Sequence, residues 1–183
     1  MIIGITGTDG SGKGTVVDYL VEHEGFVLYH ARKLFIEEIE KQGLENNRAN
    51  MRIVANQIRK EYGNDAIIIQ FLKQANERGD KKIVIDSIRA LAEAETLKRL
   101  GGILLAVDAN QHLRFERIQS RQSSSDQVTF EEFLEHEQLE MNDPDPNGMQ
   151  KAKVMKIADH TIMNGGSLEE LHRKIEEFLG MVR

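Results

Sequence analysis

The sequence contains no cysteine, only two prolines and few aromatic residues, which make up 5% of the chain. Without cysteine, disulfide bonds, thiol catalysis and cysteine-ligated zinc sites are excluded. Apolar runs such as 103–107 are far shorter than the ~18 residues that a membrane-spanning helix needs. The N-terminus has no basic start followed by a long apolar stretch, so no secretory signal is predicted. We therefore expect a cytoplasmic protein.

Basic residues are also fewer than acidic ones: the chain has 24 Lys and Arg residues and 30 Asp and Glu residues, for a net charge of -6. This balance argues against a chain that binds nucleic acid or a membrane over its whole surface, while a local basic pocket stays compatible with it. The hydrophobic fraction is 40% and the charged fraction is 30%, which is ordinary for a soluble globular enzyme. We expect the 183 residues to form one domain over 1–183.

Short β-rich runs alternate along the chain with longer segments of helical periodicity. Several of these runs are almost entirely apolar, as strands covered on both faces are. Strands that alternate with helices predict a parallel α/β sheet with right-handed crossovers. The predicted strands are Ile2–Thr6, Phe26–Tyr29, Lys82–Asp86, Ile103–Asp108 and His160–Met163.

The segment 31–81, between the second and third predicted strands, has helical patterns only and is predicted to be a helical insertion on the acceptor side. Two later helices are predicted to begin with capping boxes, one at Thr129 and one at Ser167. In parallel sheets of this type, ligands bind at the carboxyl ends of the strands. The candidate functional residues are therefore those that directly follow each strand.

The first predicted strand runs into the glycine-rich loop Gly7–Thr15, with the sequence GTDGSGKGT. A lysine after the second of two spaced glycines, between a strand and a helix, is the phosphate-binding P-loop pattern. Backbone N–H groups and the positive end of the following helix bind phosphate oxygens in such loops. Gly14 stands where many P-loop proteins carry a Ser or Thr that ligates magnesium, so Thr15 is the candidate metal ligand. The candidate donor-binding residues are Asp9, Gly10, Ser11, Gly12, Lys13, Gly14 and Thr15.

The Gly-Lys-Gly-Thr end of this loop resembles that of nucleoside monophosphate kinases of the adenylate kinase type. The resemblance implies a P-loop NTPase fold, a three-layer sandwich with a five-stranded parallel sheet in the order 2-3-1-4-5. It also implies ATP and Mg²⁺ as cofactors, with Lys13 in a catalytic role. Asp9 resembles the P-loop acid of thymidylate kinases, which implies a contact with the sugar of an acceptor nucleotide; a turn-forming acid is the alternative.

The stretch 86–89 at the end of the third predicted strand resembles the D-G-x-P-R signature of the same kinases, with Ser and Ile in place of Gly and Pro. The match implies that Asp86 holds Mg²⁺ and that Arg89 binds the acceptor phosphate with its planar guanidinium group. After the second predicted strand, Arg32 and Lys33 occupy positions where adenylate kinases have Gly-Asp. Arg32 is therefore a candidate acceptor ligand, and a solvated helix N-terminus is the alternative.

Arg114, Arg117 and Arg121 fall within about 60° of one face of a predicted helix after the fourth strand. A bound polyphosphate would relieve the repulsion in such a row of like charges. Related kinases carry an R-x-x-x-R pair here, which implies that Arg117 and Arg121 stabilise transition-state charge; a solvated helix face is the alternative. The segment 119–148 is predicted to be a short lid.

The segments 158–171 and 41–65 resemble archaeal adenylate-kinase-related proteins of unassigned function, and the first also resembles the end of dephospho-CoA kinases. In that group the turn borders the donor adenine, which makes Asn164 and Gly165 candidate adenine contacts; an ordinary strand-to-helix turn is the alternative.

The leading hypothesis is an ATP-dependent phosphotransferase that acts on a nucleoside or deoxynucleoside monophosphate. A dephospho-CoA kinase ranks second, because the sequence lacks the D-A-D motif and the GKST ending of those enzymes. A nucleotide-dependent switch or regulatory ATPase without a small-molecule acceptor is the alternative from another class. The expected partners are a nucleotide donor and a small, nucleotide-like acceptor.

Overall fold

The computed structural model describes residues 1–120, 128–145 and 148–183. Its strands form one five-stranded sheet in the order β2-β3-β1-β4-β5, and every strand pair is parallel. The predicted α/β fold and strand order are confirmed. The strands are β1 (Ile2–Gly7), β2 (Val27–His30), β3 (Ile83–Asp86), β4 (Ile103–Asp108) and β5 (His160–Met163).

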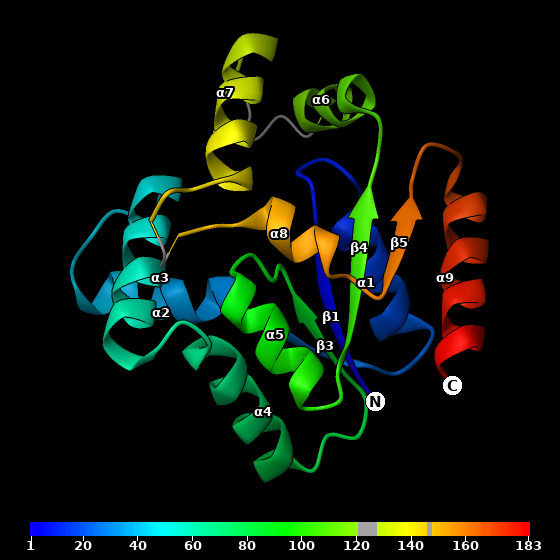
Figure 1. Cartoon of the computed structure of the whole chain (residues 1–183), viewed down its shortest axis with the longest axis horizontal. Helices are drawn as coiled ribbons and strands as arrows, with labels where there is room; N and C mark the ends of the chain where they lie inside the picture. Colours follow the sequence, from blue (N-terminus) through cyan, green and yellow to red (C-terminus); the bar gives the residue numbers. More distant parts are fainter. Residues whose placement is uncertain (121–127, 146–147) are drawn as a thin grey trace.

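Helices connect consecutive strands and flank the sheet on both sides (Figure 1). The bounds of β4 and β5 are as predicted, and those of the other strands differ by one residue. The segment between β2 and β3 contains the helices α2, α3 and α4, so its helical character is confirmed. The helices are α1 (Lys13–Glu22), α2 (Ala31–Lys41), α3 (Arg48–Tyr62), α4 (Ala66–Arg78), α5 (Leu91–Arg99), α6 (Gln111–Ser120), α7 (Phe130–Met141), α8 (Lys151–Lys156) and α9 (Leu168–Val182).

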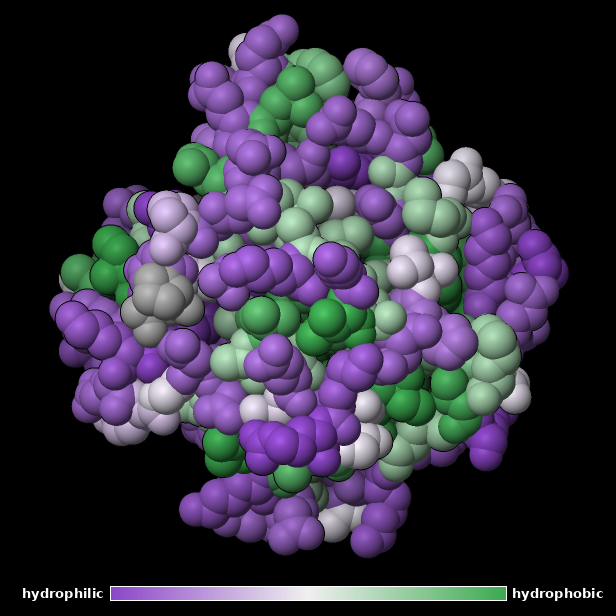
Figure 2. Space-filling model, viewed as in Figure 1, coloured by the Kyte–Doolittle hydropathy of each residue, from purple (hydrophilic) through white to green (hydrophobic). Residues whose placement is uncertain are grey.

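Two apolar cores cover the two faces of the sheet. The first contains Ile5 of β1, Leu20 of α1 and Phe178 of α9. The second contains Ile85 of β3 and Leu97 of α5. These two cores make the molecule a three-layer sandwich, and hydrophilic side chains cover much of the face seen in Figure 2. Within the described residues, no helix has both the length and the apolar character needed to cross a membrane.

Of the two predicted capping boxes, the one at Thr129 is complete in the structure, and the one at Ser167 forms only in part. At Thr129, the side chain accepts a hydrogen bond from the backbone N–H of Glu132, whose carboxylate accepts one from the backbone N–H of Thr129. At Ser167, the side chain accepts from the backbone N–H of Glu170 at 3.3 Å. The Glu170 carboxylate pairs with Lys174 instead, because that lysine lies one turn further along the same helix.

The carboxyl ends of the strands meet at one edge of the sheet. His30, the last residue of β2, is paired in register with Asp86, the last residue of β3. Gly7, at the end of β1, is paired with Val107 of β4. The P-loop, the stretch after β3 and the start of α2 therefore lie close together, at the edge where parallel sheets bind ligands.

Candidate active site

The P-loop has the backbone conformation that requires its glycines. Gly10 and Gly12 have φ values of 79° and 97°, in the left-handed region that side chains with a Cβ rarely adopt. A Cβ at Gly10 would lie 2.4 Å from the backbone oxygen of Arg114. Gly12 is the N-cap of α1 and supplies no side-chain hydrogen bond. The first N–H groups of α1 are thus not capped by a side chain of Gly12 and keep the capacity to bind an anion.

Lys13 folds over the P-loop. Its Nζ donates to the backbone oxygens of Gly7 at 3.2 Å and Thr8 at 2.6 Å, and lies 3.6 Å from Asp9 Oδ1. Burial lowers the pKa of Lys13 to about 8, and the neighbouring Asp9 carboxylate opposes that shift. A phosphate group in the loop would add negative charge beside the buried ammonium and stabilise its charged form.

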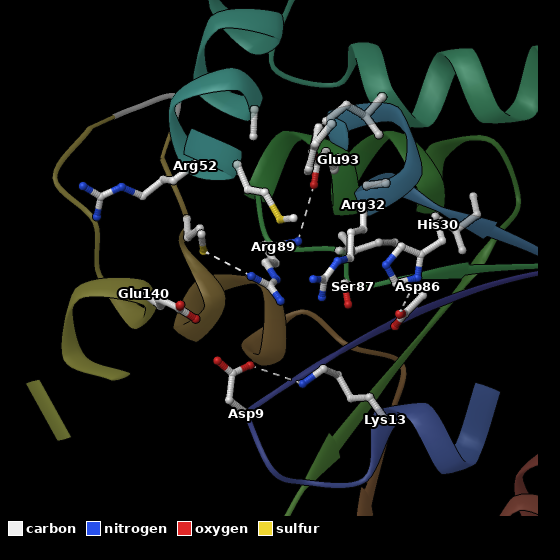
Figure 3. Close-up of a pocket in the computed structure, with 18 of the residues that line it drawn as sticks. Asp9, Lys13, His30, Arg32, Arg52, Asp86, Ser87, Arg89, Glu93 and Glu140 are labelled. Carbon is white, nitrogen blue, oxygen red and sulfur yellow. Dashed lines mark hydrogen bonds and ion pairs between the residues drawn. The ribbon is translucent and has the colours of Figure 1, made fainter. Parts of the chain in front are cut away.

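A cavity of about 540 Å³ opens at this edge of the sheet, between the P-loop, the ends of β2 and β3, and the helices α2, α3 and α4 (Figure 3). It brings together residues that lie far apart in the sequence. The predicted site residues that line it are Asp9, Gly10, Gly12, Lys13, Gly14, Arg32, Asp86 and Arg89.

Asp86 projects from the end of β3 into this cavity. Its Oδ2 lies 3.1 Å from Nδ1 of His30, while its buried Oδ1 has no hydrogen-bond partner among the described residues. Burial raises the pKa of Asp86, but the hydrogen bond and charge of His30, with smaller contributions from Ser87 and Lys13, together outweigh this and the net shift is downward. A buried, ionised carboxylate oxygen without a partner, beside a phosphate loop, fits a ligand of Mg²⁺.

The turn after Asp86 is held in an unusual conformation. Ser87 has a φ of 62°, at the position where the resembling kinase motif has glycine. The backbone N–H of Ile88 donates to Ile5 at 2.9 Å, and the Thr6 hydroxyl donates to the backbone oxygen of Ile88 at 2.8 Å. These bonds to β1 offset backbone strain of roughly 1–3 kcal/mol at Ser87. They also determine where Arg89 leaves the sheet.

Two guanidinium groups point into the cavity, from Arg32 at the start of α2 and from Arg89 (Figure 3). Among the described residues, neither guanidinium group has a carboxylate within 4.0 Å; that of Arg89 donates only to the sulfur of Met149, at 3.8 Å. Burial lowers the pKa of Arg89, but the surrounding carboxylates, Asp9 and Glu140 foremost, more than offset it and the net shift is upward. Two charged groups of one sign in one cavity favour an anionic ligand between them.

Sequence reasoning missed the buried ion pair that closes the far wall of the cavity. Arg59 of α3 places Nε and Nη2 each 3.0 Å from Oε1 of Glu93, and both side chains are about 5% exposed or less. The second Glu93 oxygen accepts from the backbone N–H of Ala90 at 3.2 Å. The pair fastens α3 to the start of α5, and no local pattern marks it because its members lie 34 residues apart.

Other predicted donor residues lie outside this cavity. Arg117 of α6 donates to the backbone oxygen of Asn164 at 3.0 Å, and the Asn164 side chain donates to the P-loop oxygen of Ser11 at 2.8 Å. Asn164 therefore braces the loop from the turn after β5, next to Gly165. Thr15 lies in the first turn of α1 but does not line the cavity.

The predicted row of arginines is only partly described. Arg121 lies outside the described residues, as do parts of the predicted lid at 121–127 and 146–147. Arg114 differs from the expectation, since its guanidinium group is buried and pairs with Glu137 of α7. The glutamate neutralises the repulsion that the row of arginines was expected to show.

Comparisons with known proteins identify the family of this chain. The model of the AAA domain family matches residues 3–143. A UPF0200 protein of Thermococcus onnurineus is 31% identical over 98% of this chain and 96% of its own length. The UPF0200 protein PH1008 of Pyrococcus horikoshii is 30% identical over 100% of this chain and 97% of its own length.

Solved structures share the fold at lower identity. TT1252 of Thermus thermophilus has a TM-score of 0.67 and 24% identity, over 100% of this chain and 98% of its own. Shikimate kinase of Aquifex aeolicus has a TM-score of 0.54 and 19% identity, over 98% of this chain and 96% of its own. A gluconokinase of Sinorhizobium meliloti has a TM-score of 0.57 and 13% identity, over 98% and 91% of the two chains. The fold is thus that of P-loop kinases.

Proposed function

This chain belongs to the UPF0200 and AAA domain families, and from that premise we propose that it is an ATP-dependent phosphotransferase whose acceptor is a nucleoside or deoxynucleoside monophosphate. One observation carries the proposal: the guanidinium groups of Arg32 and Arg89, which pair with no carboxylate in the described part of the chain, share a cavity with Lys13 of the P-loop. In this proposal the P-loop binds the phosphates of the donor, and the two arginines bind a second anion beside them.

Phosphoryl transfer requires little covalent chemistry from a protein, so the roles of the residues are positioning and charge neutralisation. The P-loop N–H groups and Lys13 hold the donor phosphates, and Arg32 and Arg89 orient the acceptor phosphate toward them. An acceptor oxygen then forms a bond to the γ-phosphorus of ATP, and the bond to the β–γ bridging oxygen breaks with its electron pair on ADP. Mg²⁺, held by Asp86 and Thr15, would neutralise phosphate charge when bound.

The remaining residues have supporting roles in this proposal. Asp9 contacts the sugar of the acceptor, and Arg117 and Arg121 neutralise charge that develops in the transition state. Asn164 and Gly165 border the donor base. The segment 31–81 holds the acceptor and the segment 119–148 acts as the lid.

A coupled assay of ADP release tests the proposal. The purified chain is incubated with ATP and Mg²⁺, and each nucleoside and deoxynucleoside monophosphate is added in turn, together with dephospho-CoA. Shikimate and gluconate belong in the panel because structural neighbours are a shikimate kinase and a gluconokinase. We expect one monophosphate to raise ADP release above the rate without acceptor.

The same assay separates the alternatives. Stimulation by dephospho-CoA alone would support a dephospho-CoA kinase. Stimulation by shikimate or gluconate alone would indicate that the acceptor group is a hydroxyl and not a phosphate. ADP release that no acceptor changes would overturn the transferase and favour a nucleotide-dependent switch. The two exposed cations Arg32 and Lys33, in place of the Gly-Asp of adenylate kinases, are the observation that favours a switch.

A further inference from the structure

Asp9 places a carboxylate inside a loop that is built to bind phosphate. Its Oδ1 lies 3.6 Å from Nζ of Lys13, the lysine expected to reach the donor phosphates. A carboxylate at this distance attracts the lysine toward itself and repels incoming phosphate oxygens. The loop therefore needs a counter-charge for Asp9 if Lys13 is to serve the donor.

Lys151, the first residue of α8, supplies that counter-charge. Its Nζ lies 3.0 Å from Asp9 Oδ1 and also pairs with Oε2 of Glu140 in α7. The Lys151 side chain is only 4% exposed, and a lysine buried to that degree is strongly unfavourable unless it is paired. The pKa of Asp9 reflects this: burial raises it, but Lys151, Arg89 and Lys13 together hold it well below the ordinary value.

Arg114 makes a second bridge of the same kind. Its Nη1 donates to the backbone oxygen of Asp9 at 3.3 Å, and its guanidinium group pairs with Glu137 of α7. Glu137 and Glu140 lie one helical turn apart, on the same face of α7. Two buried cations, Lys151 at the Asp9 carboxylate and Arg114 at the Asp9 backbone oxygen, thus join the P-loop to one face of this helix.

We infer that Lys151 is a positioning residue that neutralises Asp9, leaves Lys13 available to the donor phosphates, and couples the P-loop to α7 through Glu140. Asp9 and Glu140 share one ammonium group, so the docked position of α7 and the charge inside the P-loop depend on each other. The inference rests on the proposed function for its use of ATP as donor. The coupling to α7 is a property of the free protein and can be tested alone.

Hydrogen exchange on the free protein tests the coupling to α7. We compare the wild type with Lys151→Met, which keeps the length of the side chain, and with Lys98→Met as the matched control. Lys98 also bridges two elements, through Asp159 at 2.8 Å, but both side chains are 34% exposed. Lys151→Met should raise exchange across 130–141 at least about threefold, because the partly buried Glu140 carboxylate loses its lysine partner and destabilises the docked helix. Equal exchange in Lys151→Met and wild type would overturn the coupling.

Calorimetric titration with ATP and Mg²⁺ tests the effect on the P-loop. Lys151→Met should weaken binding at least about tenfold, because Asp9 then draws Lys13 toward itself and repels the phosphate oxygens without the charge of Lys151 to offset it. Lys151→Arg, which keeps the charge, should remain within about threefold of the wild type, and so should Lys98→Met. The double variant Asp9→Asn, Lys151→Met should bind ATP within about threefold of Asp9→Asn alone, because no charge is left to compensate.

The outcomes are distinct for the two proposals. A wild type that binds no ATP overturns the proposed function, while the exchange experiment still decides whether Lys151 couples Asp9 to α7. If the wild type binds ATP and Lys151→Met binds it equally well, the inference is wrong. It is also wrong if Asp9→Asn fails to restore binding, since Lys151 would then act by packing rather than by charge. Circular dichroism of each variant checks that it is folded.

Discussion

The cations of the site fall into two groups, one without and one with a carboxylate partner. At the ends of β2 and β3, Arg32 and Arg89 point into the cavity, and among the described residues no carboxylate lies within 4.0 Å of either guanidinium group. Beside α7, Arg114 and Lys151 are buried and each is paired with a glutamate of that helix. The difference separates two uses of positive charge: an unpaired group indicates where a ligand binds, and a paired group indicates where two parts of the protein dock.

The largest effect is expected from Lys13→Ala, which removes the cation that belongs to neither group. ATP binding should be lost in a calorimetric or fluorescence titration, because the P-loop then has no ammonium group to pair with the donor phosphates. Lys73→Ala is the control, since Lys73 is a surface residue that is 75% exposed. Binding by Lys13→Ala with unchanged affinity would remove the basis for a donor site in this loop.

A stability measurement compares the two groups directly. Arg114→Met should lower the free energy of unfolding by about 3 kcal/mol, because Glu137 would be left as a partly buried charge without its partner. Arg32→Met should change it by less than about 0.5 kcal/mol, because no ion pair is broken. Urea unfolding at pH 7 measures both values. If Arg32→Met is the more destabilising change, the assignment of the two groups is reversed.

Kinetics test the acceptor side. Arg89→Ala should raise the KM for the acceptor by about tenfold to 100-fold, since a hydrogen bond to a charged group contributes about 1.5–3 kcal/mol. The KM for ATP should change far less, because in the proposed function Arg89 binds the acceptor phosphate and the P-loop binds the donor. Arg173→Ala, on the surface of α9, is the matched control. Equal increases in both KM values would count against an acceptor-specific role.

The smallest effect is a pH dependence of donor binding. Lys13 has a pKa lowered by burial to about 8 in the free protein, and bound phosphate favours its charged form. At a pH below about 8 the lysine is already protonated, so the affinity for ATP should be constant there. Above this pH, binding requires uptake of a proton, and affinity should fall by up to about tenfold per pH unit. Lys13→Arg should abolish this fall, because arginine keeps its proton. If the affinity for ATP still falls above a pH of about 8 in Lys13→Arg, another titrating group causes the pH dependence.

Much of the fold could be predicted because it depends on neighbours in the sequence. The apolar runs at 103–108 and 160–163 coincide with β4 and β5, and the capping box at Thr129 begins α7. The P-loop at 7–15 was recognisable because its glycines adopt backbone conformations that few other residues tolerate. These features depend on interactions within a few residues, so the local sequence specifies them.

The candidate site could be predicted only where it follows such local features. Asp9, Lys13, Asp86 and Arg89 directly follow or lie within segments at the ends of strands, and the cavity brings them together as the parallel topology requires. Their chemical roles stay predictions. The sequence did not predict the charge partners. The arginines after the fourth strand were expected to bind phosphate, whereas Arg114 pairs with Glu137.

Local sequence patterns are enough to predict the alternation of strands and helices, the P-loop and the edge of the sheet at which charged residues gather. Which of those charges are paired depends on how the helices pack in three dimensions. Lys151 lies 142 residues from Asp9, and Arg59 lies 34 residues from Glu93. Such pairs form when helices pack against a common sheet, and the angle and depth of that packing are set by the whole core. No short segment carries that information, and this is why a lysine in α8 became the counter-charge of the phosphate loop.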